Sequence, residues 1–141
     1  MLHTGRGDNL RILLDTNVII SAMFFGGIPR QIHLSIVHKV HTGITSSILL
    51  SELTDVLRKK FHYSQEAALA VDKQIRKQYE LVSPRVSVHV LSDEPDNRVL
   101  EAAITGHCDG IITGDKELLA LKKFKNIPII TSNDFLTRYT V

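Results

Sequence analysis

The sequence contains one cysteine, Cys108. A single cysteine excludes an internal disulfide framework and is typical of a protein in a reducing cytosol. The chain also lacks an apolar run of about 18 residues, which a membrane-spanning helix requires, and residues 1–10 are too polar for a signal peptide. We therefore expect a cytoplasmic protein that makes no contact with a membrane.

Repeats, low-complexity tracts and long linkers are also absent. The 141 residues, 43% of them hydrophobic, are ordinary for one soluble domain. Because Gly5 and Gly7 lie in a polar N-terminal stretch, we expect a flexible leader over residues 1–10 and a single domain over residues 11–141. The net charge of +2 is too small for binding nucleic acid through charge alone, but acids gathered in one cleft would leave a more basic surface around them.

Short apolar runs alternate with helical patterns along the chain. We expect strands at residues 11–14, 43–46, 86–91, 110–113 and 128–131. We expect helices over 17–25, 29–40 and 95–105, and after the capping residues Ser46 or Ser47, Ser64, Asp115 and Ser132. This alternation indicates an α/β fold, a three-layer sandwich with a central, mainly parallel sheet. The stretch from Ser46 to about Lys77 contains no strand and is expected to form a helical arm over one edge of the sheet.

Two aspartates follow predicted strands. Asp15 ends the first strand, and Asp115 follows the fourth. Parallel strands place both residues at the carboxyl edge of the sheet, where ligands bind in open sheets. Aspartate is also a favoured helix N-cap, which would explain either residue alone. The recurrence at two strand-to-helix junctions favours a functional role, because capping accepts Ser, Thr or Asn equally well.

A third acid lies on the packing side of a predicted helix. Three of the four neighbours of Glu52 at helical spacing are apolar, namely Ile48, Leu49 and Val56. Carboxylates are seldom buried without a partner. Glu52 therefore either reaches out to water at the rim of the apolar stripe or points into a cleft as a ligand.

A fourth acid belongs to the start of the helix expected over residues 95–105. Asp93, Glu94 and Asp96 all suit this place, because the helix dipole favours negative charge in the first turn. The residue pattern alone does not choose among the three.

Carboxylates that gather at one edge need a cation or bound protons, since two of them about 4 Å apart repel by roughly 4 kcal/mol at an effective dielectric constant near 20. The sequence has no His or Cys pair at ligand spacing and no HExxH motif. Oxygen ligands alone favour Mg²⁺ or Mn²⁺ over zinc. Such ions activate water and orient a phosphate, so the pattern indicates phosphodiester hydrolysis without a covalent intermediate.

Four segments of the chain resemble, in order and spacing, the signature segments of the PIN-domain family. They are Leu14-Asp15-Thr16-Asn17-Val18, Ser51-Glu52-Leu53, the stretch from Asp96 to Ala103 and the stretch from Ile112 to Leu119. No one segment is specific, but together they extend the resemblance over residues 11 to about 136. The resemblance is to bacterial and archaeal single-domain members, many of which are toxins of toxin–antitoxin pairs.

The resemblance implies a metal-dependent ribonuclease, an endonuclease that cuts single-stranded RNA with metal-activated water. Carried over residue by residue, it assigns Mg²⁺ or Mn²⁺ to four catalytic, metal-binding acids: Asp15, Glu52, Asp96 and Asp115. It selects Asp96 because the family acid directly precedes an Asn-Arg/Lys-x-Leu segment. It further implies that Asn17 and Thr113 hold a ligand or a water in place. The implied partners are RNA, a second copy in a homodimer and a small antitoxin protein.

Other functions remain open. An RNA-binding or partner-binding module with structural acids would bind RNA without a divalent metal and after Asp15→Asn. A phospho-receiver domain also combines a parallel sheet, acids at strand ends and magnesium. It normally has an acidic pair near the first strand, however, whereas Thr16 and Asn17 follow Asp15 here, and it has no place for Glu52. A haloacid-dehalogenase-type phosphatase is disfavoured because the DxDxT motif is missing.

Several other residues suit a structural role as well as a functional one. The basic runs Arg58-Lys59-Lys60 and Lys122-Lys123-Lys125 fit either phosphate contacts or solvated helix ends. The seven histidines show no nucleophile partner, and a solvated face is expected for His33, His38 and His41. Cys108 is expected to be a partly buried thiol. Core packing explains Phe24, Phe25 and Ile28 better than a partner contact does.

Overall fold

The central sheet is built from the short apolar runs of the sequence. A computed structural model describes residues 9–139, in which six strands form one sheet in the order β3-β2-β1-β4-β6-β5. The strands are β1 (Arg11–Leu14), β2 (Thr42–Ser46), β3 (Glu80–Val82), β4 (Gly110–Ile112), β5 (Lys123–Phe124) and β6 (Ile127–Ile130). All neighbours pair in parallel except β5 and β6. The predicted α/β fold with a mainly parallel sheet is confirmed.

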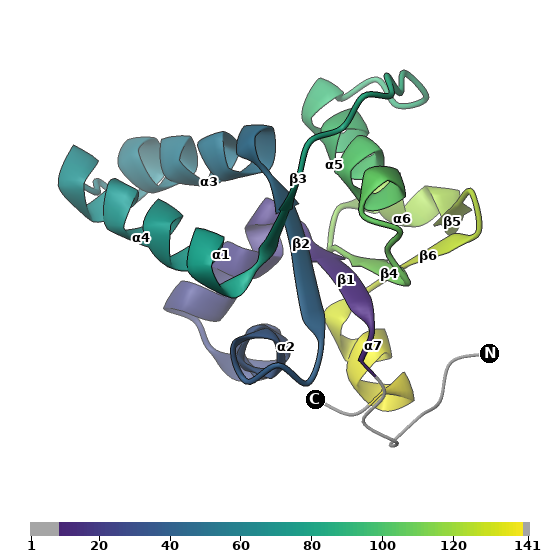
Figure 1. Cartoon of the computed structure of the whole chain (residues 1–141), viewed down its shortest axis with the longest axis horizontal. Coiled ribbons are helices and arrows are strands. Elements are labelled where there is room, and N and C mark those ends of the chain that lie inside the picture. The colour runs from purple at the N-terminus through teal and green to yellow at the C-terminus, as the bar shows by residue number, and fades with distance from the viewer. Residues whose placement is uncertain (1–8, 140–141) are drawn as a thin grey trace.

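Helices cover both faces of this sheet and complete the three layers (Figure 1). They are α1 (Thr16–Phe24), α2 (Gly27–Val37), α3 (Ser47–Lys60), α4 (Gln65–Gln78), α5 (Glu94–Thr105), α6 (Lys116–Leu121) and α7 (Ser132–Arg138). The central strand β1 is buried on both sides, because Ile12 and Leu14 belong to one apolar core and Leu13 to the other. Residues of α1, α2 and α7 fill the first core, and residues of α5 and α6 fill the second.

The expected helical arm consists of α3 and α4. Ser46 caps α3 by accepting the N–H of Leu49 at 3.3 Å, and Ser64 caps α4 by accepting the N–H of Ala67 at 3.1 Å. The two helices pack against each other and extend from the β3 side of the sheet (Figure 1). The chain between the end of β2 and the start of β3 thus returns to the same edge through two helices.

The strand predicted at residues 86–91 is wrong. This segment belongs to no strand, and side chains of α5 bind its backbone instead. Glu101 accepts the N–H of Val88 at 2.9 Å, and Asn97 exchanges hydrogen bonds with the N–H and carbonyl of Leu91 at 3.0 and 2.8 Å. The pattern missed two short strands: β3, which has three residues and follows α4 closely, and β5, which has two.

Smaller differences concern caps and single residues. Thr131, not Ser132, caps α7 by accepting the N–H of Asp134 at 3.1 Å, and α2 begins at Gly27, two residues before Pro29. Of the leader predicted over residues 1–10, residues 1–8 lie outside the described residues. Leu10 is only 4% exposed and donates its N–H to Nδ1 of His41 at 3.1 Å. His41 is therefore buried, contrary to the solvated face expected for it. No helix formed by residues 9–139 is long and apolar enough to cross a membrane.

Candidate active site at the carboxyl ends of the strands

Asp15 lies at the junction of β1 and α1, and its carboxylate faces the neighbouring strand end. The backbone N–H of Asp15 donates to the carbonyl of Ile112 in β4 at 3.0 Å. Although Asp15 occupies the N-cap position of α1, its side chain makes no capping hydrogen bond. Its Oδ2 instead accepts a hydrogen bond of 2.7 Å from the hydroxyl of Thr113. Helix capping therefore does not account for this aspartate.

Thr113 connects Asp15 to the second aspartate. Its hydroxyl donates to Asp15 and also accepts the backbone N–H of Asp115 at 3.0 Å. Asp115 is half-buried, and its Oδ1 caps α6 by accepting the N–H of Leu118 at 2.9 Å. One carboxylate oxygen of Asp115 thus serves the helix. Two aspartates that stand 100 positions apart in the sequence are held around one buried hydroxyl.

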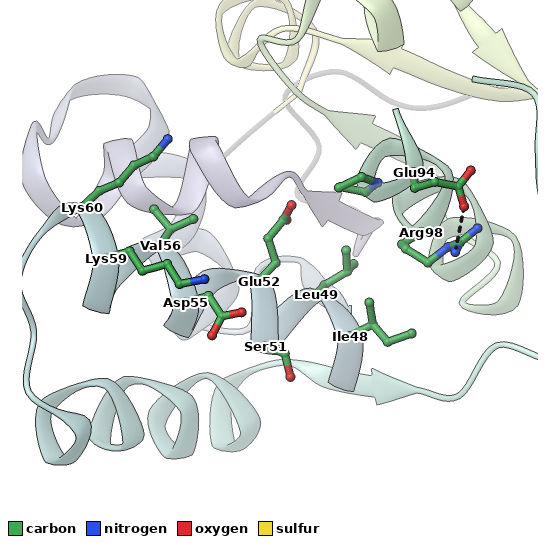
Figure 2. A pocket seen from close by; sticks show the side chains of 11 residues that line it. Ile48, Leu49, Ser51, Glu52, Asp55, Val56, Lys59, Lys60, Glu94 and Arg98 are labelled. Carbon is green, nitrogen blue, oxygen red and sulfur yellow. Dashed lines mark hydrogen bonds and ion pairs between the residues drawn. The ribbon is translucent and has the colours of Figure 1, made fainter. Parts of the chain in front are cut away.

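Glu52 approaches the same region from α3. Its side chain is half-buried and extends from α3 toward the start of α1 (Figure 2). Its Oε1 accepts a hydrogen bond from the hydroxyl of Thr16. The sequence left two positions open for the Glu52 side chain, either in water at the rim of the apolar stripe or in a cleft. The geometry corresponds to the cleft.

Asp96 is the buried member of the three acids that begin α5. Asp96 is 7% exposed, whereas Asp93 and Glu94 are exposed. Glu94 forms an ion pair with Arg98 at 3.4 Å and therefore has a structural partner. The Oδ2 of Asp96 is buried and has no hydrogen-bond partner among residues 9–139.

The pKa values of Asp15 and Asp96 are raised by burial and by the charges of neighbouring acids. Burial is the main cause that raises the pKa of Asp15, and the charges of Glu52 and Asp115 add to it, while the Thr113 hydrogen bond acts in the opposite direction. Burial, followed by the charges of Asp115, Asp93 and Asp15, raises the pKa of Asp96 to about 7. Four acids from four separate elements therefore share one electrostatic environment, which favours a proton or a cation.

The residues fit a divalent metal ion in the manner of a hydrated magnesium site. Within the part of the chain that the structure describes, no group of three or more carboxylate, imidazole or thiol side chains forms a complete metal-binding cluster. Magnesium needs no such cage, because it usually keeps several waters and binds one or two carboxylates together with substrate phosphates. The unpartnered oxygen of Asp96 and its raised pKa mark a position where a cation would be stabilised. All four acids offer the hard oxygen ligands that magnesium and manganese prefer.

The two residues expected to support the acids differ in their surroundings. Thr113 is 1% exposed and its hydroxyl is bound to both aspartates. Asn17 is exposed, and its side chain makes no hydrogen bond with another described residue. The residue that contacts an acid from this segment is its neighbour Thr16, which the sequence reasoning passed over. In the sequence, the signal for Thr16 was a hydroxyl directly after Asp15. The structure adds that this residue is buried.

Two hollows lie next to residues of this site. The larger, about 540 Å³, lies between α3 and the start of α5 and contains Glu52 in its wall (Figure 2). The smaller, about 380 Å³, is lined by Thr113. Its lining carries hydroxyl and amide groups but no charge: Asn17, Val18, Ser21, Pro29, Thr113, Gly114, Thr131, Ser132 and Asn133.

Comparison with known proteins adds a family and a fold. The family described as PIN domain matches residues 11–117. No curated protein sequence matches the chain at a significant level.

Two solved structures share the fold. One is the crystal structure of VapBC2 from Rickettsia felis bound to a DNA fragment from its promoter, with a TM-score of 0.59 and 14% identity over 86% of this chain and 98% of that chain. The other is a protein from Pyrobaculum aerophilum, with a TM-score of 0.57 and 16% identity over 94% of this chain and 92% of that chain. At such low identity, the likeness establishes the fold and not the activity.

Proposed function

This chain belongs to the PIN-domain family, and we propose that it is a ribonuclease that cuts single-stranded RNA with the help of Mg²⁺ or Mn²⁺. The observation that carries the proposal is the electrostatic coupling of Asp15, Glu52, Asp96 and Asp115, brought from four elements to one edge of the sheet. Family membership supports nuclease activity in general. The donor set supports the metal, and the hollows lined by Glu52 and by Thr113 offer space for a strand-like substrate.

The chain's own residues hold the acids ready for such chemistry. Thr113 positions Asp15 and Asp115 through one hydroxyl, and Thr16 positions Glu52 through another. A divalent ion, when bound by the acids, would supply an activated water and a positive charge at the phosphate. Groups that fix the orientation of metal ligands commonly contribute about 10- to 100-fold in metal affinity or activity.

The burial of Asp96 also prepares the site for a cation. A carboxyl with a pKa of about 7 is only partly ionised near neutral pH when no cation is present. A cation beside it would favour the ionised form, because opposite charges lower the pKa of an acid. Asp96 would thereby give up its proton when a metal ion binds, and the buried site would hold no uncompensated charge in either state.

The proposed partners and location follow from the same family. The protein from Rickettsia felis is a VapBC2 complex bound to promoter DNA. We propose by analogy that this chain is the toxin of a toxin–antitoxin pair, that a small antitoxin covers its acids, and that it forms a homodimer in the cytoplasm. The buried single thiol of Cys108 is compatible with a reducing compartment.

The decisive experiment compares cleavage of single-stranded RNA in Mn²⁺, in Mg²⁺ and after addition of EDTA. Wild type, Asp15→Asn and Asp115→Asn are tested together with Glu66→Gln, which removes an exposed carboxylate from α4 as a control. We expect metal-dependent cleavage by wild type and Glu66→Gln, and none by the two aspartate variants. Equal cleavage by all four proteins would indicate a contaminant. RNA binding without cleavage, unchanged by EDTA and by Asp15→Asn, would replace the nuclease proposal with a binding module.

A further inference from the structure

The groove that contains Glu52 continues along α3 to a pair of lysines. Lys59 and Lys60 line the same hollow as Glu52 and follow it by seven and eight positions (Figure 2). Two turns of helix return these residues to the face of Glu52, at a distance of roughly 10–12 Å along the helix axis. A single nucleic-acid strand that reaches the acids could follow this face toward the lysines.

The charges of the groove leave its lysine end cationic. Arg98 is paired with Glu94 at 3.4 Å and with Glu101 at 2.9 Å. Lys59 and Lys60 are exposed and form no ion pair with any residue in 9–139. Apart from Glu52, which belongs to the acidic cluster, the remaining charge on this wall is Asp55, one turn before Lys59. Two ammonium groups against one carboxylate give the end of the groove a net positive charge.

The groove has an apolar wall on both sides of Glu52. On α3, Val56 lies between Glu52 and the lysines, whereas Ile48 lies one turn before Glu52, and Pro95 lines the groove from α5. Ile48 is 58% exposed, so that core packing does not explain this isoleucine. An aliphatic surface beside an acidic cluster and two cations offers contact to flat apolar rings. An apolar protein segment would use the same surface, but it would leave the two ammonium groups without anions.

We propose that this groove binds the RNA strand next to the bond that is cut, with backbone phosphates on Lys59 and Lys60 and bases against Ile48, Val56 and Pro95. The inference rests on the proposed ribonuclease function and assigns the side of the acids from which the strand is held. Binding of phosphates by lysine releases counterions and therefore has a measurable salt dependence, whereas the apolar contacts do not.

The test measures both cleavage and binding with one short single-stranded RNA. Initial rates in Mn²⁺ give KM and kcat, and fluorescence anisotropy in EDTA gives the binding constant at several salt concentrations. The variants are Lys59→Ala, the double variant Lys59→Ala/Lys60→Ala, and Arg58→Ala. Arg58 is the matched control, because its replacement removes the same charge from the same helix end, but it lines a different hollow.

We expect KM to rise in the lysine variants while kcat stays within about twofold of the wild-type value. The slope of log K against log salt concentration should decrease in magnitude by about 0.7 for each lysine that no longer binds a phosphate of the single strand. Arg58→Ala should retain the wild-type slope and KM. If Lys59→Ala and Arg58→Ala behave alike, or if neither differs from wild type, the proposal is wrong.

A second pair of variants tests the apolar wall. Ile48→Ser removes an exposed side chain from the groove, and Leu69→Ser removes one that is 51% exposed on α4 and lines the hollow of Arg58. Ile48→Ser should weaken RNA binding without changing the salt slope, and Leu69→Ser should leave binding unchanged. If wild type fails to cleave RNA, the ribonuclease proposal fails, but the anisotropy measurements still decide whether RNA occupies the groove. RNA binding that none of these variants alters would instead point to a protein occupant and overturn the inference.

Discussion

The hydroxyl of Thr113 donates a hydrogen bond of 2.7 Å to Oδ2 of Asp15, a residue 98 positions earlier in the chain. The same hydroxyl accepts the backbone N–H of Asp115. This side chain is 1% exposed, so no water replaces it. Thr113 thereby links the carboxylate of Asp15 to the backbone of Asp115.

Replacement of this hydroxyl is expected to impair both stability and metal binding. Thr113→Val keeps the shape but leaves a buried acceptor and a backbone donor unsatisfied, at a cost of about 1–3 kcal/mol in the free energy of unfolding. We expect metal affinity or cleavage to fall by about 10- to 100-fold. Thr113→Ser, which retains the hydroxyl, is the control. Chemical denaturation and metal titration measure the two effects, and equal values for the two variants would refute the role of the hydroxyl.

Asp96 makes the stability of the metal-free protein depend on pH. Its pKa is about 7 in the folded protein against an ordinary value of 3.8. Between these pH values the folded state binds more protons than the unfolded state, so the free energy of unfolding falls as the pH rises from about 4 to 7. Thermal unfolding in EDTA should therefore show a Tm that decreases over this range. Asp96→Asn should flatten this contribution and raise the Tm at pH 8, and an unchanged profile would contradict the assignment.

Metal binding should stabilise the protein through Glu52. A ligand that binds only the folded state at 100 times its Kd adds about 2.7 kcal/mol to the free energy of unfolding. We expect Mn²⁺ to raise the Tm of wild type and of Glu66→Gln, and to raise that of Glu52→Gln much less. The increase should be larger at pH 8 than at pH 6, because Asp96, with a pKa of about 7, is then mostly ionised. A full Tm increase in Glu52→Gln would exclude Glu52 as a ligand.

Thr16 and Asn17 are expected to act differently. Thr16→Val removes the hydroxyl that holds Glu52, so we expect weaker metal binding, by about 10-fold or more. Asn17 lies in the uncharged hollow beside Thr113, so Asn17→Ala should alter the cleavage of RNA more than the affinity for metal. Metal titration followed by initial-rate measurements separates the two. A larger loss of metal affinity in Asn17→Ala than in Thr16→Val would restore the role that the sequence assigned to Asn17.

Asn97 is expected to hold the segment of residues 86–91 against α5. Its fully buried side chain binds the backbone of Leu91 twice and also donates to Glu94 at 3.0 Å. Asn97→Ala should lower the free energy of unfolding by about 1–3 kcal/mol, since buried backbone groups lose their partners. Limited trypsin digestion should cut the variant faster after Arg85, which directly precedes this segment. Unchanged protection at Arg85 would show that other contacts hold the segment.

Local pattern was sufficient for much of the fold. The apolar run at residues 11–14, buried on both faces, is recognisable as a central parallel strand, and Ser46 and Ser64 marked helix starts through their short polar side chains. The alternation at Val86, Val88 and Val90 led to the wrong prediction of a strand. A valine at every second position does not reveal whether the backbone pairs with a strand or with side chains. In this protein the side chains of Glu101 and Asn97, which follow later in the chain, bind the backbone of this segment in place of a neighbouring strand.

The amino-acid order alone shows which acids stand at strand-to-helix junctions, and the parallel sheet that it implies brings their ends to one edge. The groups that surround each acid, in contrast, are known only from the folded chain. Burial leaves Asp96, rather than Asp93 or Glu94, with an unpartnered oxygen and a pKa of about 7, and packing places Thr16 rather than Asn17 against Glu52. The physical reason is that desolvation and hydrogen bonding act over a few ångströms, and the neighbours at that range come from β1, α3, α5 and the end of β4, which are distant in sequence.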